Sequence, residues 1–133
     1  MSKLLIGILL CLFLIGCSDG VSDRAKEFFL NAYTGKPMQA EEWLTKDARS
    51  AQLFNAFGGL EALIRDCAAE TERNQGLKSV NVLKIKHEGK VFLVEVEIVF
   101  NNNQKVNGED AWIQENGKWK ITDKPIEESS SVK

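Results

Sequence analysis

The stretch 91–100, VFLVEVEIVF, decides the fold of this chain because its side chains alternate in character with a period of two. One set of alternate positions holds only large apolar residues: Phe92, Val94, Val96, Ile98 and Phe100. Glu95 and Glu97 fall between them and point the other way. The pattern predicts a long strand of an antiparallel sheet with one buried face and one solvated face.

The residues before this strand predict a first hairpin. Glu88-Gly89 is interpreted as its two-residue turn, and the preceding strand carries Leu83 and Ile85. Closing the hairpin there places Ile85 opposite Phe92 and Leu83 opposite Val94. This register keeps the apolar side chains of both strands on one face of the sheet.

The residues after the strand predict two more strands. Residues 101–104 form a turn, residues 105–115 a third strand, and Asn116-Gly117 is the strongest hairpin signal in the chain. The expected pairs across this last turn are Gln114 with Trp119 and Trp112 with Ile121. The second half of the chain therefore reads as a four-stranded antiparallel meander.

The first half of the chain has helical periodicity instead. A stripe at helical spacing comprises Val21, Ala25, Phe28, Phe29, Ala32 and Tyr33, and Gly35 ends it. Residues 40–44 form a short helical turn, Thr45 caps a second helix through residues 48–57, and a third helix spans residues 60–74. Helices followed by an antiparallel sheet with one apolar face predict an α+β domain, over residues 21–123, in which the helices pack on that face.

Leu14-Ile15-Gly16-Cys17 closes an apolar run, residues 4–15, that follows the single cation Lys3. The run is too short to span a bilayer, which needs about 20 residues, but it has the length of a signal-peptide core. We therefore expect residues 1–16 to be a signal peptide, and the resemblance described next implies a cut between Gly16 and Cys17. The alternative is a plain secretory signal in which Cys17 is incidental.

The same tetrad resembles the processing site of bacterial lipoprotein precursors. The resemblance implies that Cys17 is acylated and that residues 17–20 are a lipidated tether, so that the membrane itself becomes a partner of the chain. Two or three acyl chains, at about 0.8 kcal/mol per buried methylene, hold a protein on a membrane. Ser18, rather than an aspartate, follows the cysteine, which implies the outer membrane, facing the periplasm, over the inner membrane.

Composition excludes several classes of protein. The chain has 133 residues, and removal of residues 1–16 leaves 16 basic and 19 acidic residues, a net charge of −3. This weak acidity gives no basic footprint for nucleic acid. Cys67 has no disulfide partner once Cys11 is removed and Cys17 is acylated, and its place on an apolar helical stripe predicts a small core residue. Residues 124–133 are polar and are expected to be disordered.

The order of elements over residues 21–123 resembles the nuclear transport factor 2-like superfamily (cystatin-like α+β cones), which includes small bacterial lipoproteins. The residues that carry the likeness are the hairpin 115–122 with Trp119 and Ile121, the alternating strand, and the pair Phe28-Phe29. The resemblance implies a curved sheet wrapped around helices, with a cone whose mouth can hold a ligand. Members include isomerases, dehydratases, carriers and binding modules, so the fold does not decide function.

Few residues are candidates for chemistry. His87, the single histidine, stands beside the first hairpin turn and is expected to be solvated. Asp110 lies two residues before Trp112 and would face the cone if the strand is regular. We favour the alternative that the strand bulges near Gly108 and turns Asp110 outward, because no histidine or acid partner accompanies it.

Aromatic residues could line an apolar pocket, although at these spacings they more often form the core. The candidate pocket residues are Tyr33, Trp43, Phe57, Asp110 and Trp112. Tyr33 is interpreted as a core residue with a satisfied hydroxyl rather than a catalyst. The sequence shows no metal-ligand set, no phosphate-binding loop and no Ser-His-Asp arrangement, so neither a metal nor a cofactor is expected.

These observations predict a membrane-anchored, non-enzymatic binding or assembly module of the cell envelope. Its expected partner is an envelope protein. The resemblance to the nuclear transport factor 2-like superfamily adds a homodimer as an alternative, because dimers through the open face of the sheet are common in that superfamily. One alternative is a carrier of a small apolar ligand in the cone. Another is a hydrolase or isomerase centred on Asp110.

Overall fold

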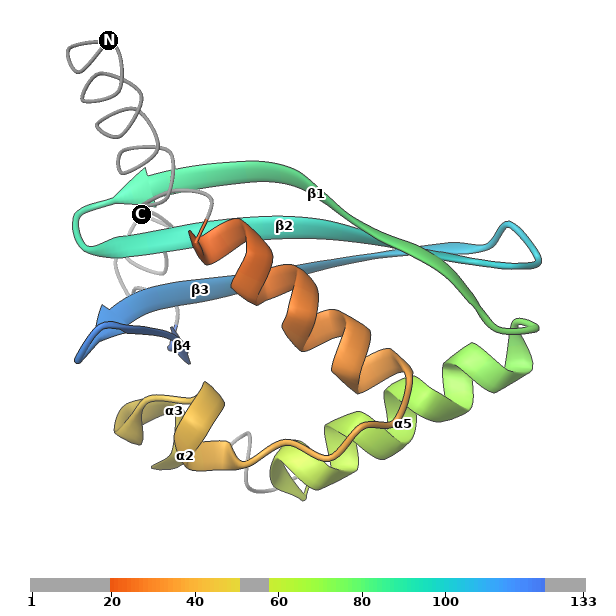
Figure 1. Ribbon diagram of the computed structural model, residues 1–133, viewed down its shortest axis with the longest axis horizontal. Coiled ribbons are helices and arrows are strands. Elements are labelled where there is room, and N and C mark those ends of the chain that lie inside the picture. The colour runs from red at the N-terminus through yellow and green to blue at the C-terminus, as the bar shows by residue number, and fades with distance from the viewer. Residues whose placement is uncertain (1–19, 51–57, 124–133) are drawn as a thin grey trace, which may run out of the picture.

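The computed structural model describes residues 20–50 and 58–123, and these form two layers. Helices cover one face of a curved sheet (Figure 1). The predicted signal peptide, the acylation site at Cys17, the part of the second helix that holds Phe57, and the polar tail lie outside the described residues. Within the described part of the chain, no helix is long and apolar enough to cross a membrane.

The sheet is the predicted four-stranded antiparallel meander. Its strands are β1 (Leu77–Glu88), β2 (Val91–Phe100), β3 (Lys105–Glu115) and β4 (Lys118–Thr122), and they follow one another in the order β1-β2-β3-β4. The last hairpin has the expected register, with Gln114 opposite Trp119 and Trp112 opposite Ile121. The α+β prediction is confirmed.

The register of the first hairpin differs from the prediction. Glu88 pairs with Val91, so the turn consists of Gly89 and Lys90. Gly89 has φ = 63°, which suits the first central position of a turn that matches the twist of the strands. A turn at Glu88-Gly89 would have placed a glutamate at that position.

The shifted turn and a bulge together move the apolar residues of β1. Ile85 lies opposite Val94, not Phe92, and the register shifts again between Val82 and Lys84, which leaves Leu83 at the bulge. Leu83 is therefore 50% exposed rather than paired with Val94 in the core.

The described helices cover residues 20–33, α2 (Ala40–Trp43), α3 (Lys46–Ser50) and α5 (Gly59–Arg73). The first ends at Gly35, whose φ of 77° ordinary side chains rarely adopt. Thr45 caps α3 as predicted, since its hydroxyl accepts a hydrogen bond of 3.2 Å from the backbone N–H of Ala48.

The core fills the space between the two layers. The fully buried large side chains come mainly from the sheet: Trp112, Phe100, Ile98, Val80, Val94 and Val96, with Val21 from the first helix. Phe28 connects the layers, because its ring packs 5.7 Å from that of Trp43 and 5.9 Å from that of Trp112. The centre of the cone is thus closed by aromatic packing.

Arg24 connects three elements beside this core. Its Nε donates to the carbonyl of Trp119 at 3.1 Å, and its Nη2 donates to the carbonyl of Glu42 at 2.8 Å. The guanidinium also lies 3.5 Å from the centroid of the Trp43 ring. One side chain of the helix 20–33 thereby holds both α2 and β4 in place.

Candidate functional site

A pocket of about 280 Å³ lies where the helices meet the end of β4. Most of its lining is apolar, and two carboxylates contribute to it. The described residues that line it are Phe28, Phe29, Leu44, Ala48, Leu60, Leu63, Asp110, Ile121, Thr122 and Asp123. The pocket therefore combines an apolar wall from the helices with acidic groups from the sheet.

Backbone pairing places the helix side of this pocket against β4. Leu44 and Ile121 form a short parallel bridge, and the N–H of Thr45 donates to the carbonyl of Ile121 at 2.9 Å. The segment between α2 and α3 thus acts as a fifth, minimal strand at the edge of the sheet. Because Leu44 and Ile121 are held by backbone hydrogen bonds, this wall of the pocket is fixed by the fold.

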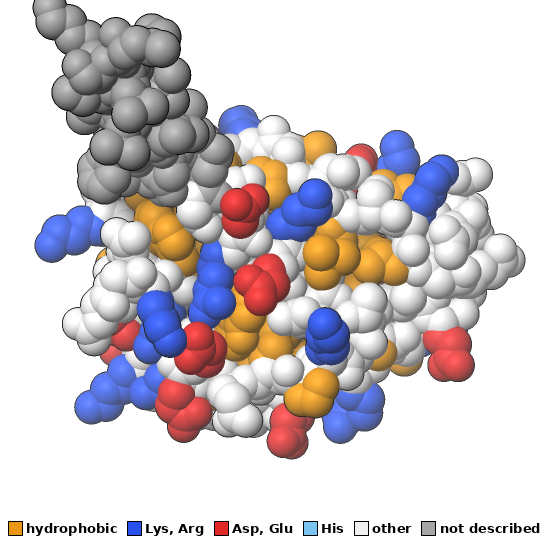
Figure 2. All heavy atoms as spheres, viewed as in Figure 1, with side chains coloured by type: hydrophobic (Ala, Val, Ile, Leu, Met, Phe, Trp, Pro, Cys, Tyr) orange, Lys and Arg blue, Asp and Glu red, His pale blue; other side chains and the backbone are white. Residues whose placement is uncertain are grey.

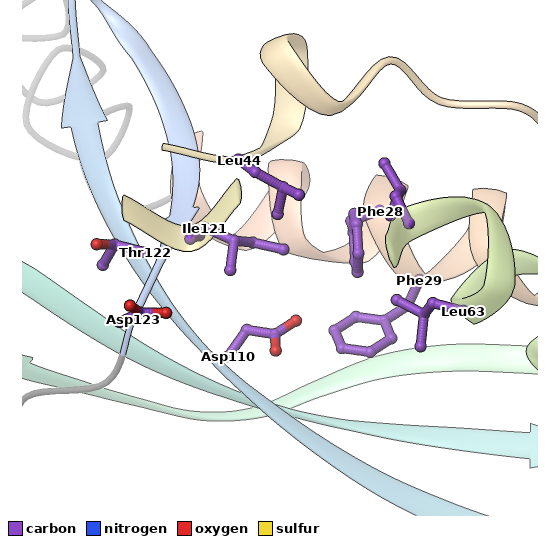
Figure 3. A pocket seen from close by; sticks show the side chains of 10 residues that line it. Phe28, Phe29, Leu44, Leu63, Asp110, Ile121, Thr122 and Asp123 are labelled. Carbon is purple, nitrogen blue, oxygen red and sulfur yellow. The ribbon is translucent and has the colours of Figure 1, made fainter. Parts of the chain in front are cut away.

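Asp110 points into the pocket. The pairing of β2 with β3 is regular from Phe92–Trp112 to Val99–Lys105, and Asp110 lies opposite Val94 in the row that also holds Trp112. Its side chain therefore projects toward the helices, beside Phe29 and on the same wall as Asp123 (Figure 3). The favoured expectation of a bulge that turns Asp110 outward is wrong, because Gly108 remains in register with Val96.

Gly108 makes room for an aromatic ring rather than marking a bulge. A Cβ atom at Gly108 would lie 3.1 Å from Cε1 and 3.2 Å from Cζ of Phe29, closer than ordinary van der Waals contact. The missing side chain lets the ring of Phe29 rest directly on β3. Gly108 therefore determines how far this ring reaches along the strand toward Asp110.

Tyr33 and Cys67 form a second pair of ionisable groups in the core. They share a hydrogen bond, and Tyr33 is 6% exposed while Cys67 is 8% exposed. Burial raises the pKa of Tyr33, and burial, opposed by the hydrogen bond from Tyr33, raises the pKa of Cys67 to about 11. Both groups are protonated at neutral pH, so Cys67 is not a thiolate nucleophile.

The structure brings only some of the predicted pocket residues together. Asp110 lines the pocket, whereas Tyr33, Trp43 and Trp112 are buried in the adjoining core, and Phe57 lies outside the described residues. The indole N–H of Trp112 is buried without an acceptor among the described residues. His87 is exposed, as predicted, and its ring stacks on Phe92 at 4.2 Å.

Sequence reasoning missed Asp123. Asp123 directly follows β4, which ends at Thr122, and it lines the pocket. No group of three metal-ligating side chains occurs in residues 20–50 and 58–123.

One solved structure with the same arrangement is a protein from Campylobacter jejuni described as a "Putative NTF2-like transpeptidase". It matches with a TM-score of 0.64 and 18% sequence identity, over 77% of this chain and 97% of that protein. The fold is nuclear transport factor 2-like. Helices packed inside a curved antiparallel sheet are what the resemblance in the sequence implied.

Two designed proteins show weaker likeness to this nuclear transport factor 2-like domain. A de novo protein with a curved sheet matches with a TM-score of 0.44 and 20% identity, over 86% of this chain and 93% of the design. A de novo nuclear transport factor 2 fold matches with a TM-score of 0.41 and 16% identity, over 87% of this chain and 85% of the design. No protein-family model and no curated protein matches the sequence.

The prediction that the chain is not an enzyme is corrected by this comparison. It relied on the missing catalytic motifs, yet a protein with the same fold carries the name of a transpeptidase. The lack of a familiar motif in the sequence therefore does not exclude catalysis on this fold. At 18% identity the likeness establishes the fold alone.

Proposed function

We propose that the protein is a lipid-anchored binding module of the cell envelope, and that its nuclear transport factor 2-like domain holds a small amine-bearing apolar group. The observation that carries the proposal is the pocket with Asp110 and Asp123 on an otherwise apolar wall. The tetrad that ends at Cys17 supports a lipid anchor on this cysteine. Ser18 directly after it supports placement in the outer membrane. The domain then acts on molecules in the periplasm.

The size of the pocket supports a small group rather than a lipid. About 280 Å³ is near the lower limit of ligand pockets, which hold roughly 300–1,000 Å³. The centre of the cone is filled by Trp112, Phe100 and Ile98, each fully buried. A carrier function for a small apolar ligand is therefore limited to ligands that fit in about 280 Å³.

The acidic groups support a cationic end on that ligand. Apolar walls from Phe28, Phe29 and Leu44 accept a short hydrocarbon, and the carboxylates accept N–H donors from an ammonium group. The group can belong to a free small molecule or to a side chain of an envelope protein. Either source presents the same chemistry to the pocket.

Calorimetry with hexylamine and hexanol tests the pocket. We expect hexylamine to bind the processed protein about tenfold more tightly than hexanol, since the two differ only in the charged group. Asp110→Asn should abolish the difference. The matched control is Glu109→Gln, which removes one charge from the neighbouring position on the opposite face of β3. Equal binding of the two probes by the unmodified protein would contradict the proposal.

Membrane fractionation and mass spectrometry test the anchor. Cys17→Ser should leave the protein without acyl chains and outside the membrane fraction. Cys11→Ser is the matched control, because Cys11 lies within the predicted signal peptide and its loss should leave acylation at Cys17 intact. A Cys17→Ser protein that is still cleaved and membrane-bound would contradict the anchor.

The name of the Campylobacter jejuni protein suggests a second candidate function for the same pocket. A transpeptidase transfers the acyl group of a peptide to an amine, and a pocket that holds an amine beside a carboxylate suits the acceptor of such a reaction. Asp110 would accept the proton that the attacking amine loses and return it to the amine that leaves when the peptide bond of the donor breaks. Incubating the protein with a peptide donor and hexylamine tests this: transfer of the acyl group to the amine supports it, and transfer that persists in Asp110→Asn refutes this role of Asp110.

A further inference from the structure

One end of the sheet gathers the start of the first helix and the tips of two hairpins. A Cβ atom at Gly20 would lie 3.0 Å from Nε1 of Trp119, so the helix begins against β4. The ring of Trp119 lies 5.1 Å from that of Phe92, and Phe92 stacks on His87 near the end of β1. These contacts connect Gly20 to the tip of the β1–β2 hairpin through two aromatic rings.

The opposite end of the sheet lies away from this cluster. There the turn 101–104 joins β2 to β3, and the N–H of Asn101 donates to the carbonyl of Gly76 just after α5. Figure 1 shows the two ends on opposite sides of the molecule. The domain thus has one end near its lipid attachment and one end far from it.

Residues 83–90, the second half of β1 and the turn that follows it, have an unusual surface for a solvated strand. Leu83 is 50% exposed and Ile85 37% exposed, which makes them two of the four exposed large hydrophobic residues in the described part of the chain. Three exposed lysines lie in the same segment. Lys84 stands between Leu83 and Ile85, Lys86 follows Ile85, and Lys90 is in the turn. None of these lysines forms an ion pair with a described residue, and Glu88 is the only acid in the segment.

This segment contrasts with one face of the molecule and with the other lysines at its own end of the sheet. On the face visible in Figure 2, acidic and basic side chains are interspersed. Elsewhere at the same end the lysines are paired, with Lys118 bound to Glu42 at 2.9 Å and Lys120 to Glu115 at 3.5 Å. Lys84 lies opposite Glu95 in the sheet, so the lysines of residues 83–90 with neither an ion pair nor an acid directly opposite, among the described residues, are Lys86 and Lys90.

We propose that residues 83–90 form a second membrane contact, in which Leu83 and Ile85 enter the headgroup region and the three lysines pair with anionic phospholipids. The inference rests on the proposed acylation of Cys17. Two residues, Ser18 and Asp19, separate Cys17 from Gly20, and the three Cα–Cα steps between them span at most about 11 Å. The end of the sheet that holds the hairpin tip is thus kept within reach of the lipid headgroups.

Charge and position both support a lipid surface as the occupant. Lysines near an anionic leaflet are attracted to it within about one Debye length, roughly 10 Å at 0.1 M salt. Trp119, which lies between Gly20 and Phe92, is a residue type that favours the boundary between lipid and water. β1 is also an edge strand, so its side chains on both faces are accessible to a surface that approaches the edge.

Lysines on an edge strand have another known use, since they prevent pairing with a further strand. That explanation accounts for Lys84 and Lys86 but not for the exposure of Leu83 and Ile85, which raises the risk of such pairing. An experiment must therefore distinguish contact with lipid from protection of the edge.

The experiment uses the acylated protein purified from membranes and reconstituted into phosphatidylcholine vesicles with or without 30% phosphatidylglycerol. An environment-sensitive fluorophore is attached at Leu83→Cys or, as the matched site at the far end of the sheet, at Gln104→Cys. Lipids with a spin label near the headgroup quench a fluorophore that touches the bilayer. Cys67 does not compete for the label, since its thiol is buried and protonated.

We expect the probe at position 83 to be quenched several-fold more than the probe at position 104, and more strongly in anionic vesicles. Replacing Lys84, Lys86 and Lys90 by glutamine should remove the dependence on anionic lipid. Replacing the exposed Lys36, Lys46 and Lys78 by glutamine removes the same amount of charge and should leave the dependence on anionic lipid unchanged.

The possible failures are distinguishable. Equal quenching at the two positions would overturn the second contact but not the anchor. Quenching at position 83 that depends neither on anionic lipid nor on the three lysines would do the same. A purified protein whose mass shows no acyl chains overturns the anchor and the second contact together.

Discussion

Replacing Arg24 by lysine should destabilise the domain although the charge is kept. Arg24 is 18% exposed and reaches two backbone carbonyls in different elements, that of Trp119 in β4 and that of Glu42 in α2. The two bonds use two nitrogens of one planar guanidinium. A lysine ammonium is a single point and cannot occupy both positions.

The magnitude follows from the bond that is lost. A hydrogen bond from a charged donor contributes about 1.5–3 kcal/mol, and the carbonyl left behind is partly buried. Contact with the Trp43 ring is weakened as well, although an ammonium retains part of it. We therefore expect Arg24→Lys to lower the free energy of unfolding by about 2 kcal/mol, or the midpoint of thermal unfolding by roughly 10 °C for a domain of this size.

Urea unfolding followed by circular dichroism measures this change. The matched control is Lys26→Arg, the reverse exchange at an exposed position of the same helix, which should leave stability within about 0.5 kcal/mol. Glu42→Gln should also have little effect, because the Glu42 carboxylate is 3.8 Å from Arg24 and 44% exposed. An Arg24→Lys protein as stable as the original would show that the two carbonyl bonds are not what Arg24 contributes.

Three further predictions concern single positions. Gly108→Ala should displace the Phe29 ring and weaken hexylamine binding in calorimetry several-fold, since its Cβ would lie 3.1 Å from that ring; unchanged affinity would contradict the assigned role. Cys67 should resist iodoacetamide at pH 8 until the protein unfolds. Its raised pKa also means that the thiol ionises first in the unfolded chain, so stability should fall as pH rises from about 9 to about 11, and Cys67→Ala should flatten that slope in urea titrations. Thr45→Ala should cost about 1 kcal/mol of unfolding free energy, because it removes the cap bond to Ala48, and a neutral result would argue against that cap.

The sequence predicted the elements well where the signal is local. The alternation in residues 91–100 and the Asn116-Gly117 turn each specify their own geometry, and the register of β3 with β4 was correct at both pairs that were named. Gly35 likewise ended the first helix as expected. In each case the decisive residues lie within a few positions of the structure that they determine.

Errors arose where the geometry depends on contacts that are distant in sequence. The bulge beside Leu83 is visible only in the pairing of β1 with β2, and the amino acids of β1 do not predict it. Gly108 was read as a bulge because glycine often marks one, whereas here it admits the ring of Phe29 from a helix almost 80 residues earlier. A single sequence offers no means to distinguish these two uses of glycine.

The position of the pocket follows from unequal strand lengths. β4 ends at Thr122, which pairs with Ala111, so among residues 20–50 and 58–123 the part of β3 from Asp110 back to Lys105 pairs with β2 alone. Beyond that point the inward row of β3 holds Asp110 and Gly108, where a continuing strand would have supplied apolar side chains to close the core. Asp110 projects toward the helices at that point and lines the pocket together with Thr122 and Asp123. The acidic wall of the pocket therefore lies where β4 ends. A chain with a longer fourth strand would be expected to fill the pocket and to replace Asp110 with an apolar residue.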